Sequence, residues 1–366
     1  MNTLCVLPTI INTPVFWCIS QGDKELCYNK KKENKLLGLP TNIWSLWPIA
    51  RKINKTASIL ANPGVFVFCI SMKLHPIEAG NFKLDGGAMF GVVPKTLWNK
   101  TNPSNANNMI DIAARCLLLE DGNKLTLIDT GMGNKQSEKF FGYYHKWGDH
   151  SLEKSLKKAG FHKDDVTDVF MTHLHFDHCG GSVDWNKNKT GYTPAFKNAH
   201  YWSNKAHFKW ATKPNRRERA SFLEENILPL QQSGQLRFIE GPNCSFSKEN
   251  DRIDFLEKSE LGFGVFFADG HTDKQMLPTL VHQGKTIVFM GDLLPTAGHL
   301  PLPYVMGYDT RPLLTLPEKE KFLNAAADHN YYLFLEHDPH NQIITVKHTE
   351  KGVRLDTAFT FNELFN

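Results

Sequence analysis

The sequence predicts one large α/β domain at residues 72–366, preceded by an extension at residues 1–71. From Met72 onward, short apolar segments of strand length alternate with segments of helical period, and turns rich in Gly, Pro and Asn separate them. Residues able to bind metals or protons directly follow several of the apolar segments. The length of 366 residues fits two domains, or one large domain with an extension.

The first 71 residues differ in character from the rest. They contain four of the seven cysteines and the run Lys30-Lys31-Lys32, and no period of 3.6 or 2 residues persists through them. We therefore expect residues 1–71 to be a poorly ordered extension, or a non-native one if the functional protein starts near Met72. Mass spectrometry of the protein from its native host tests the second alternative.

The composition is that of a soluble globular protein whose partners are small molecules. Hydrophobic residues make up 41% and charged residues 22% of the chain, which is enough to build a sizeable core. The net charge of +4 is too small for a dedicated nucleic-acid binder. No apolar run reaches the roughly 18 residues that a membrane span needs. We expect neither nucleic acid nor membrane as a partner.

The cysteines and the N-terminal segment favour a reducing compartment. The seven cysteines show no CxxC spacing, so they indicate neither a disulfide framework nor a thiolate zinc site. The moderately apolar stretch Leu4–Ile19 lacks the basic residues and the cleavage site of a secretory signal. We expect a cytoplasmic protein, with export as the alternative.

The elements predicted in the first half of the domain are strands that end in polar loops. Apolar runs bounded by turn residues predict strands, and helical spacing with a glycine stop predicts helices. The aromatic-rich segment Asp184–Arg219 is interpreted as a substrate lid. The predicted elements are a hairpin of Ile110–Leu119 and Lys124–Asp129, a helix at Ser151–Ala159, a strand at Val166–Thr172 and a helix at Phe222–Leu230.

The second half repeats this organisation. Its strands also end in residues that could serve a site, and its one long helix is expected to begin with a proline. The predicted elements are a strand at Gly264–Ala268, a hairpin of Thr279–Val281 and Thr286–Met290, a helix at Pro317–Asp328, a strand at Tyr331–Leu335, and a hairpin of Ile343–Val346 and Val353–Leu355.

The clearest chemical signal lies between Thr172 and Gly181. Three imidazoles and one carboxylate occupy six positions there, at His173, His175, Asp177 and His178. In a loop that leaves a strand, positions i and i+2 can face one metal while i+4 and i+5 turn toward a second. Two glycines then let the chain turn tightly. The spacing predicts a site for zinc or a similar ion rather than unrelated surface histidines.

Three further candidate ligands each lie just beyond an apolar strand. These are His271, Asp292 and His337. Taken singly, His271 could be a structural histidine, Asp292 a turn residue, and His340 could replace His337. Their shared placement at strand ends favours one common site. Asp129, also at a strand end, is expected to accept a hydrogen bond from a ligating imidazole and so fix its tautomer, with turn capping as the alternative.

These motifs resemble those of the metallo-β-lactamase-fold hydrolases. HxHxDH followed by Gly-Gly is preceded by Asp-Thr-Gly and followed by Gly-His-Thr, Gly-Asp and a late His, in the family's order over residues 72–366. The resemblance implies a four-layer αββα sandwich with two divalent metal ions, zinc first, with Mn, Fe or Co as alternatives. It implies that His173, His175 and His271 hold the first metal, that Asp177, His178 and His337 hold the second, and that Asp292 bridges them.

The same resemblance narrows the reaction. A bridging Asp292 differs from true β-lactamases, and His175 stands where flavodiiron oxidoreductases have Glu. No phosphate-binding motif points to a nuclease. The expected activity is hydrolysis of a neutral ester, lactone, thioester or phosphotriester by a metal-bridging hydroxide, which the two metals make available near pH 7. No nucleophilic Ser or Cys is required, so Cys179 is expected to pack beneath the metal loop.

The stretch Asp85–Lys95, together with Trp98, resembles the lactonase and methyl-parathion-hydrolase-like branch. This resemblance implies a lactone substrate first, then arylesters or phosphotriesters, and members of the branch often form dimers. Many lactonases carry a Tyr three residues after the bridging Asp, where this chain has Pro295. Tyr304 or Tyr308 is expected to replace it. Asp177 and Asp292 complete the catalytic set.

The substrate pocket is predicted less directly, and two other functions stay open. Aromatic residues with some polar help from His299 are expected to form its walls. The alternatives are a glyoxalase-II-like thioesterase and a non-catalytic metal-binding module that docks a partner. The aromatic candidates are Phe90, Trp98, Trp202, Phe208 and Trp210.

Overall fold

The computed structural model describes residues 72–241 and 255–365, and five strands within residues 1–71. The chain divides into two compact units, Met1–Ser71 and Met72–Asn366. The prediction of a poorly ordered or non-native extension falls largely outside the described residues and stays a prediction. The first unit has a sheet of order β1-β2-β3 and a β4-β5 pair. Their bounds are β1 (Thr3–Val6), β2 (Phe16–Gln21), β3 (Lys24–Asn29), β4 (Ser58–Asn62) and β5 (Val65–Cys69).

Two sheets form the centre of the second unit. The six-stranded sheet has the order β13-β12-β9-β8-β7-β6, and the seven-stranded sheet runs in chain order from β14 to β20. The first comprises β6 (Lys73–Asp85), β7 (Met109–Asp121), β8 (Lys124–Ile128), β9 (Asp168–Phe170), β12 (His200–Ser203) and β13 (Leu236–Phe238). The second comprises β14 (Phe255–Leu256), β15 (Gly264–Ala268), β16 (Gln275–His282), β17 (Lys285–Phe289), β18 (Tyr332–Phe334), β19 (Ile343–Lys347) and β20 (Arg354–Phe359).

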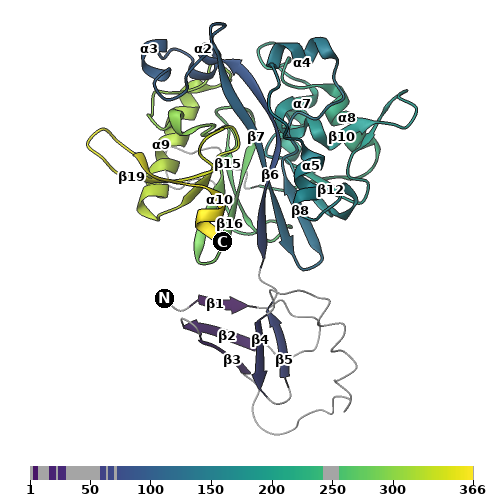
Figure 1. Ribbon diagram of the computed structural model, residues 1–366, viewed down its shortest axis with the longest axis vertical. Coiled ribbons are helices and arrows are strands. Elements are labelled where there is room, and N and C mark those ends of the chain that lie inside the picture. The colour runs from purple at the N-terminus through teal and green to yellow at the C-terminus, as the bar shows by residue number, and fades with distance from the viewer. Residues whose placement is uncertain are drawn as a thin grey trace. The chain divides into compact units, whose positions relative to one another are not determined.

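Helices cover the outer face of each sheet, as Figure 1 shows, with α9 on one flank and α5, α7 and α8 on the other. The helices are α2 (Gly86–Phe90), α3 (Lys95–Trp98), α4 (Glu138–Tyr144), α5 (Leu152–Lys158), α6 (Phe176–Cys179), α7 (Lys205–Thr212), α8 (Glu224–Gln232), α9 (Pro312–Asp328) and α10 (Phe361–Phe365). A small hairpin of β10 (Val183–Trp185) and β11 (Tyr192–Pro194) and three 3₁₀ turns, at Lys163–Asp165, Gly180–Ser182 and Ala297–His299, complete the described elements.

Side chains of the central strands alternate between the two faces of each sheet, and this alternation explains the layers of the sandwich. In β7, Leu117 and Leu119 face the core between the two sheets, whereas Cys116 and Leu118 face the core under α5, α7 and α8. Successive side chains of a strand point to opposite faces, so a strand that is apolar throughout must be buried on both. The seven-stranded sheet follows the same rule, because Phe322 of α9 packs on its outer core. The four-layer αββα sandwich is confirmed.

Most predicted elements are present, although several others were not predicted and some predicted bounds or roles differ. The long helix begins at Pro312 rather than at Pro317, which lies inside it. The 13-residue strand β6 was not predicted. The lid prediction for Asp184–Arg219 is wrong for its centre, since β12 pairs with β9 and β13 inside the sheet, and Tyr201 is fully buried.

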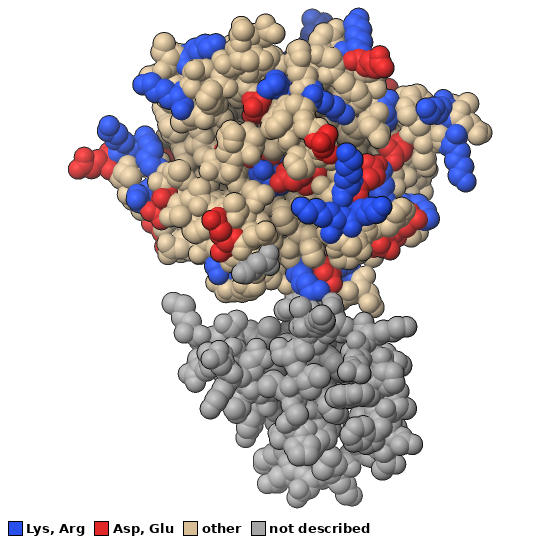
Figure 2. Space-filling view, in the orientation of Figure 1, with Lys and Arg blue, Asp and Glu red and all other residues tan. Residues whose placement is uncertain are grey.

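The surface carries charges of both signs. On the face shown in Figure 2, Lys and Arg side chains are interspersed with Asp and Glu. Of the helices that the structure describes, none is long and apolar enough to cross a membrane.

Candidate metal centre

The strands of both sheets deliver the predicted ligands to one place. His173 and His175 lie in the loop that leaves β9. His271 follows β15, Asp292 follows β17, and His337 follows β18 in the other sheet. All five side chains are at least nine-tenths buried. Ligands from opposite sheets therefore converge at one edge of the sandwich.

The metal loop is shaped by a short helix and a close backbone crossing. His175 precedes the first residue of α6, and its extended backbone (φ −66°, ψ 151°) starts the helix that carries Asp177 and His178. A Cβ on Gly180 would lie 2.3 Å from the carbonyl oxygen of Met132. The backbone at Gly180 is ordinary right-handed helix, so the glycine is required by this crossing rather than by a tight turn.

The first group of ligand atoms centres on His175. Its Nδ1 lies 3.0 Å from Nε2 of His173 and 3.1 Å from Nε2 of His271. Oδ2 of Asp292 is 3.1 Å from Nε2 of His271 and 3.9 Å from Nε2 of His173. One atom from each of these four residues therefore falls within 4.8 Å of every other.

The second group shares Asp292 with the first. Nε2 of His337 lies 3.1 Å from Nε2 of His178 and 3.0 Å from Oδ1 of Asp292. Oδ2 of Asp177 is 3.9 Å from Nε2 of His337. Asp292 thus presents one oxygen to each group, which is the geometry of a bridging carboxylate.

Each imidazole has an inner nitrogen that faces the centre and an outer nitrogen that faces away from it. The hydrogen bond of the outer nitrogen shows whether the inner one is free to bind a metal. Nδ1–H of His337 donates to the carbonyl oxygen of Ala113 (2.8 Å), and Nδ1–H of His271 donates to Asp309 (2.8 Å). A neutral imidazole protonated on its outer nitrogen carries a lone pair on the inner one. The inner nitrogens at 3.0–3.1 Å then face one another with lone pairs, which is repulsive unless a cation lies between them.

Asp292, the carboxylate of the first group, also indicates a site for cations. Oδ1 of Asp292 is buried and accepts no hydrogen bond among the described residues. Burial opposes ionisation of Asp292, but His178 and His271 hold its pKa well below the usual range. Burial likewise opposes protonation of His271 and His337, yet Asp292 raises the pKa of His271 to about 10 and that of His337 to about 9. The centre attracts positive charge, and its residues fit two divalent cations.

Asp129 sits where the sequence predicts an orienting carboxylate. Its Oδ2 is 3.1 Å from Nδ1 of His178 and accepts the Thr172 hydroxyl at 2.6 Å, and its Oδ1 accepts the backbone N–H of Thr172. Its φ of +57° is a left-handed conformation that Asp tolerates better than most residues. This contact supports the proposed role of fixing the His178 tautomer.

Three buried carboxylates at the centre were not predicted. Glu218 lies 3.0 Å from Nε2 of His175, Asp309 lies 2.8 Å from Nδ1 of His271, and Glu336 lies 3.0 Å from Nδ1 of His178. Burial alone would raise the pKa of Glu218, but the hydrogen bond and charge of His175 hold it at about 2. No motif spacing marks Glu218 or Asp309, although Glu336 immediately precedes a predicted ligand.

A cavity of about 130 Å³ opens onto the ligands. The ligand side chains that reach it include Asp177 and Asp292, and no Lys or Arg is among the described residues that line it. Its other walls are formed by Leu84, Met89, Tyr144, Phe176, Ala220, Ser221, Met306 and Tyr308.

The two candidate phenols lie in different places. Tyr308 lines the cavity and is 39% exposed, whereas Tyr304 packs edge-on against Phe90 and is not among the lining residues. Tyr144, which was not predicted, also lines the cavity. Burial and the Asp177 charge raise the pKa of Tyr308, and the same causes raise the pKa of Tyr144 to about 12. Both hydroxyls therefore remain proton donors at neutral pH.

The loop Met306–Arg311 joins the cavity wall to the metal centre. Met306 and Tyr308 line the cavity, and Asp309 orients His271 one residue later. The N–H of Thr310 donates to the carbonyl oxygen of His271 itself (3.0 Å). This loop therefore contributes both to the cavity wall and to the contacts that hold His271.

The predicted aromatic pocket is wrong. Phe90 stacks between Trp98 and His299, with ring centroids 5.3 and 4.2 Å away. The ring nitrogens of His299 form hydrogen bonds with the Thr296 hydroxyl and the Met89 carbonyl oxygen. His299 therefore packs in this aromatic stack and does not line the cavity. Trp202, Phe208 and Trp210 belong to or pack against the hydrophobic cores.

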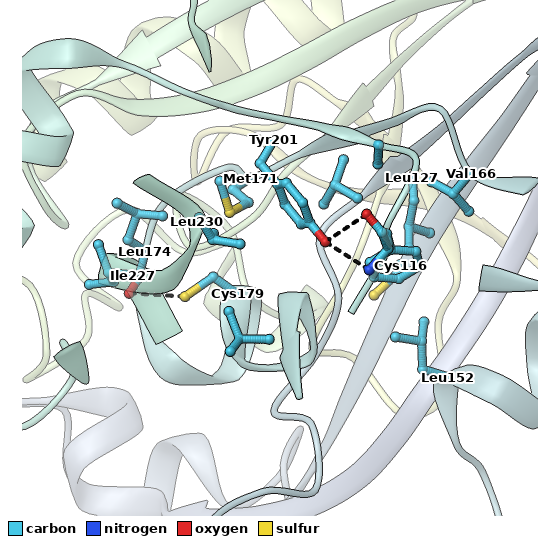
Figure 3. Close-up of a cluster of buried hydrophobic side chains, with 14 of the residues drawn as sticks. Cys116, Leu127, Leu152, Val166, Met171, Leu174, Cys179, Tyr201, Ile227 and Leu230 are labelled. Carbon is cyan, nitrogen blue, oxygen red and sulfur yellow. Dashed lines mark hydrogen bonds between the residues drawn. The ribbon is translucent and has the colours of Figure 1, made fainter. Parts of the chain in front are cut away.

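Cys179 packs beneath the metal loop, as predicted. Figure 3 shows it among aliphatic side chains, with its Sγ–H donating to the Leu174 carbonyl oxygen (3.3 Å). Burial raises the pKa of this thiol to about 12. His340 is exposed, so His337 supplies the late histidine of the centre.

Comparisons with solved structures find the same architecture. A "probable metal-dependent hydrolase" from Staphylococcus aureus is 28% identical with a TM-score of 0.67, over 79% of this chain and 96% of that one. The dizinc quorum-quenching lactonase AidC is 23% identical (TM-score 0.61; 79% and 95%), and the hydrolase AbOPH is 18% identical (0.62; 80% and 97%). At these identities the last two show the fold alone.

The family comparison covers the centre itself. The model of the metallo-beta-lactamase superfamily matches residues 111–337, which contain every predicted ligand from His173 to His337. No curated protein matches the chain. With the αββα sandwich and the paired ligand groups already evident, the chain belongs to the metallo-beta-lactamase superfamily.

Proposed function

We propose that this metal-dependent hydrolase opens lactones, and cleaves related neutral esters or phosphotriesters, with two divalent ions. The observation that carries this proposal is a pair of candidate ligand groups beside a cavity whose described lining includes no Lys or Arg, with a different oxygen of Asp292 about 3 Å from a histidine of each group. The superfamily supplies the hydrolytic class. The structural neighbour AidC is named as a dizinc lactonase, and this proposal extends that substrate class to the present chain.

The chain offers ligands for both ions. His173, His175 and His271 would hold one ion. The other would be held by Asp177, His178 and His337, and Asp292 would contribute to both. Bound there, the ions would lower the pKa of a coordinated water toward neutrality and polarise the electrophilic oxygen of the substrate. Zinc suits imidazole and carboxylate ligands, and Mn, Fe or Co accept the same donors.

The chain's own residues would bind and orient the substrate. Tyr308 lines the same cavity as Asp177, and its phenol, which is protonated at neutral pH, would donate a hydrogen bond to a substrate oxygen. Met89, Phe176 and Met306 provide an apolar surface for an acyl or aryl group and exclude water from the reacting atoms.

The lining distinguishes this proposal from a glyoxalase-II-like thioesterase. A glutathione thioester carries carboxylates, and burying them calls for cationic partners. The described lining offers Asp177 and Asp292 but no Lys or Arg, which favours neutral substrates. A non-catalytic binding module would not need a cavity opening onto both ligand groups.

The test combines metal content with hydrolysis in one sample. Metal per chain is measured by elemental analysis of purified protein, and opening of an acyl-homoserine lactone is followed before and after chelation. About two metals per chain with chelator-sensitive ring opening is the expected result.

Two other outcomes count against parts of the proposal. Two metals with no lactone opening, but with cleavage of a phosphotriester or a glutathione thioester, would overturn the lactone assignment. No bound metal after reconstitution with zinc or manganese would overturn the metallohydrolase mechanism itself.

A further inference from the structure

One ligand imidazole is turned the opposite way from the others. His175 presents Nδ1 to the centre, while His173, His271 and His337 present Nε2. With Nδ1 inward, the outer nitrogen of His175 is Nε2, the ring atom farther from its own backbone. Its hydrogen-bond partner therefore has to come from a different part of the chain.

That partner is Glu218, 43 residues away. Oε1 of Glu218 accepts the Nε2–H of His175 at 3.0 Å, and the Glu218 residue is only 3% exposed. Oε2 accepts from Nε1–H of Trp210 (2.6 Å) and from the Asn215 amide (3.1 Å). Three donors converge on one carboxylate, so its position is fixed from both sides.

The same stretch of chain touches the metal loop twice more. We call residues 205–221, from the start of α7 to Ser221, the brace segment. Within it, Nε2 of His207 accepts the backbone N–H of Leu174, the residue between His173 and His175, at 2.9 Å. The carbonyl oxygen of Ser221 accepts the N–H of Phe176 at 2.9 Å. The brace segment therefore contacts the chain on both sides of His175.

We propose that Glu218 is a positioning residue that holds His175 protonated on Nε2, with its Nδ1 lone pair directed at the first metal position. A carboxylate behind a ligating imidazole fixes the tautomer and increases the basicity of the ligand. The proposal rests on the metal site of the proposed function but not on its substrate. Because Ala220 and Ser221 line the cavity, Glu218 also connects the cavity wall to the first metal position.

The test is a matched pair of substitutions in the full chain. Glu218→Gln cannot satisfy the three donors, because an amide offers one acceptor oxygen where the carboxylate offers two. Glu224→Gln is the control, since Glu224 is an exposed carboxylate at the start of α8. Zinc per chain is measured by elemental analysis across a series of chelator-buffered free zinc concentrations, and the melting temperature of the metal-free protein is measured in parallel.

We expect Glu218→Gln to release one of the two zinc ions at about 10- to 100-fold higher free zinc than the natural protein, with a smaller shift for the second ion. Trp210→Phe, which removes one of the three donors to Glu218, should give an intermediate shift. Glu224→Gln should leave both ions unchanged.

Two results would overturn the inference. Equal weakening of both ions with a lowered melting temperature of the metal-free protein would show that Glu218 only maintains the fold. Unchanged zinc binding would show that His175 needs no carboxylate partner. These results are separate from the activity: a natural protein that binds two zinc ions but opens no lactone removes the substrate assignment and leaves the role of Glu218 intact.

Discussion

Each candidate ligand imidazole of the centre has two ring nitrogens with different partners, and the hydrogen-bond partner of the outer nitrogen decides whether the inner one is free for a metal. His337 uses a backbone carbonyl, His271 uses Asp309 and His175 uses Glu218. Carbonyl and carboxylate oxygens only accept, so each of these partners requires a proton on the outer nitrogen. The protonation of the centre is therefore fixed by residues that do not bind the metal.

Loss of a ligand should empty the centre, whereas loss of its exposed neighbour should not. We expect His337→Ala to lose at least one metal per chain and to reduce hydrolysis by more than about 100-fold, because it removes a ligand itself and not only an outer partner. His340→Ala changes an exposed histidine three residues away and is the matched control. Equal metal content and activity in both variants would remove His337 from the site. Elemental analysis and initial rates measure the difference.

The two candidate phenols can be separated by kinetics. Tyr308→Phe should lower kcat by about 10-fold, which corresponds to one lost hydrogen bond of about 1.4 kcal/mol to the reacting oxygen. Tyr304→Phe should stay within about twofold of the natural rate, since Tyr304 packs against Phe90 outside the cavity lining. A larger loss for Tyr304→Phe than for Tyr308→Phe would reverse the assignment.

His299 should make folding sensitive to acid. Burial lowers the pKa of His299 to about 3, against 6.5 in an exposed histidine. The fold therefore favours the neutral ring, and this contribution is present above pH 6.5 and is lost as the pH falls toward 3. Linkage predicts that His299→Gln reduces the slope of unfolding free energy against pH, between about pH 6 and 4, by up to about 1.4 kcal/mol per pH unit. Urea denaturation at several pH values measures it, and parallel slopes would exclude His299.

At the scale of elements, the metal loop depends on how closely it approaches its neighbour. The carbonyl oxygen of Thr130 would lie 2.3 Å from a Cβ on Gly181, and that of Met132 at the same distance from one on Gly180. The sequence alone attributes these two glycines to a tight turn. The physical reason is a backbone crossing, which no local pattern reveals because the two segments lie about fifty residues apart.

An added methyl group should therefore distort this loop. We expect Gly180→Ala to destabilise the protein by about 1–3 kcal/mol and to weaken metal binding, because backbone rather than a flexible side chain must move. Gly142→Ala is the control, since a Cβ at Gly142 in α4 meets nothing within 4 Å. Urea denaturation compares them, and equal stability of the two variants would contradict the crossing.

Elements with a regular pattern could be predicted, and those fixed by distant partners could not. Both ends of strand β15 were predicted correctly, because its five residues form an uninterrupted nonpolar run between two turns. Strand β6 was missed because His75, Pro76 and Asn81 interrupt its pattern. The residues that gather at the centre could be predicted from their motif and strand-end positions, whereas Glu218 and Asp309 reach the centre only through the folded chain.

Both sheets of the second unit contribute residues to the candidate metal centre. One sheet supplies the HxHxDH loop, and the other supplies His271, Asp292 and His337. Metal binding should therefore stabilise the sandwich as a unit. At free metal 1,000 times the Kd, one site contributes about 4 kcal/mol. We expect chelation to lower the melting temperature by several degrees and zinc to restore it. Scanning calorimetry measures the shift, with His337→Ala responding less, and an unchanged melting temperature would contradict it.

The loop Met306–Arg311 has a consequence for how this protein could acquire a new specificity. Met306 and Tyr308 shape the cavity, yet Asp309 and Thr310 beside them hold His271. Selection for a bulkier substrate acting on this loop would also disturb His271, a candidate metal ligand. Productive adaptive changes should instead accumulate at Leu84, Met89 and Tyr144, whose side chains line the cavity from elements that carry no metal ligand.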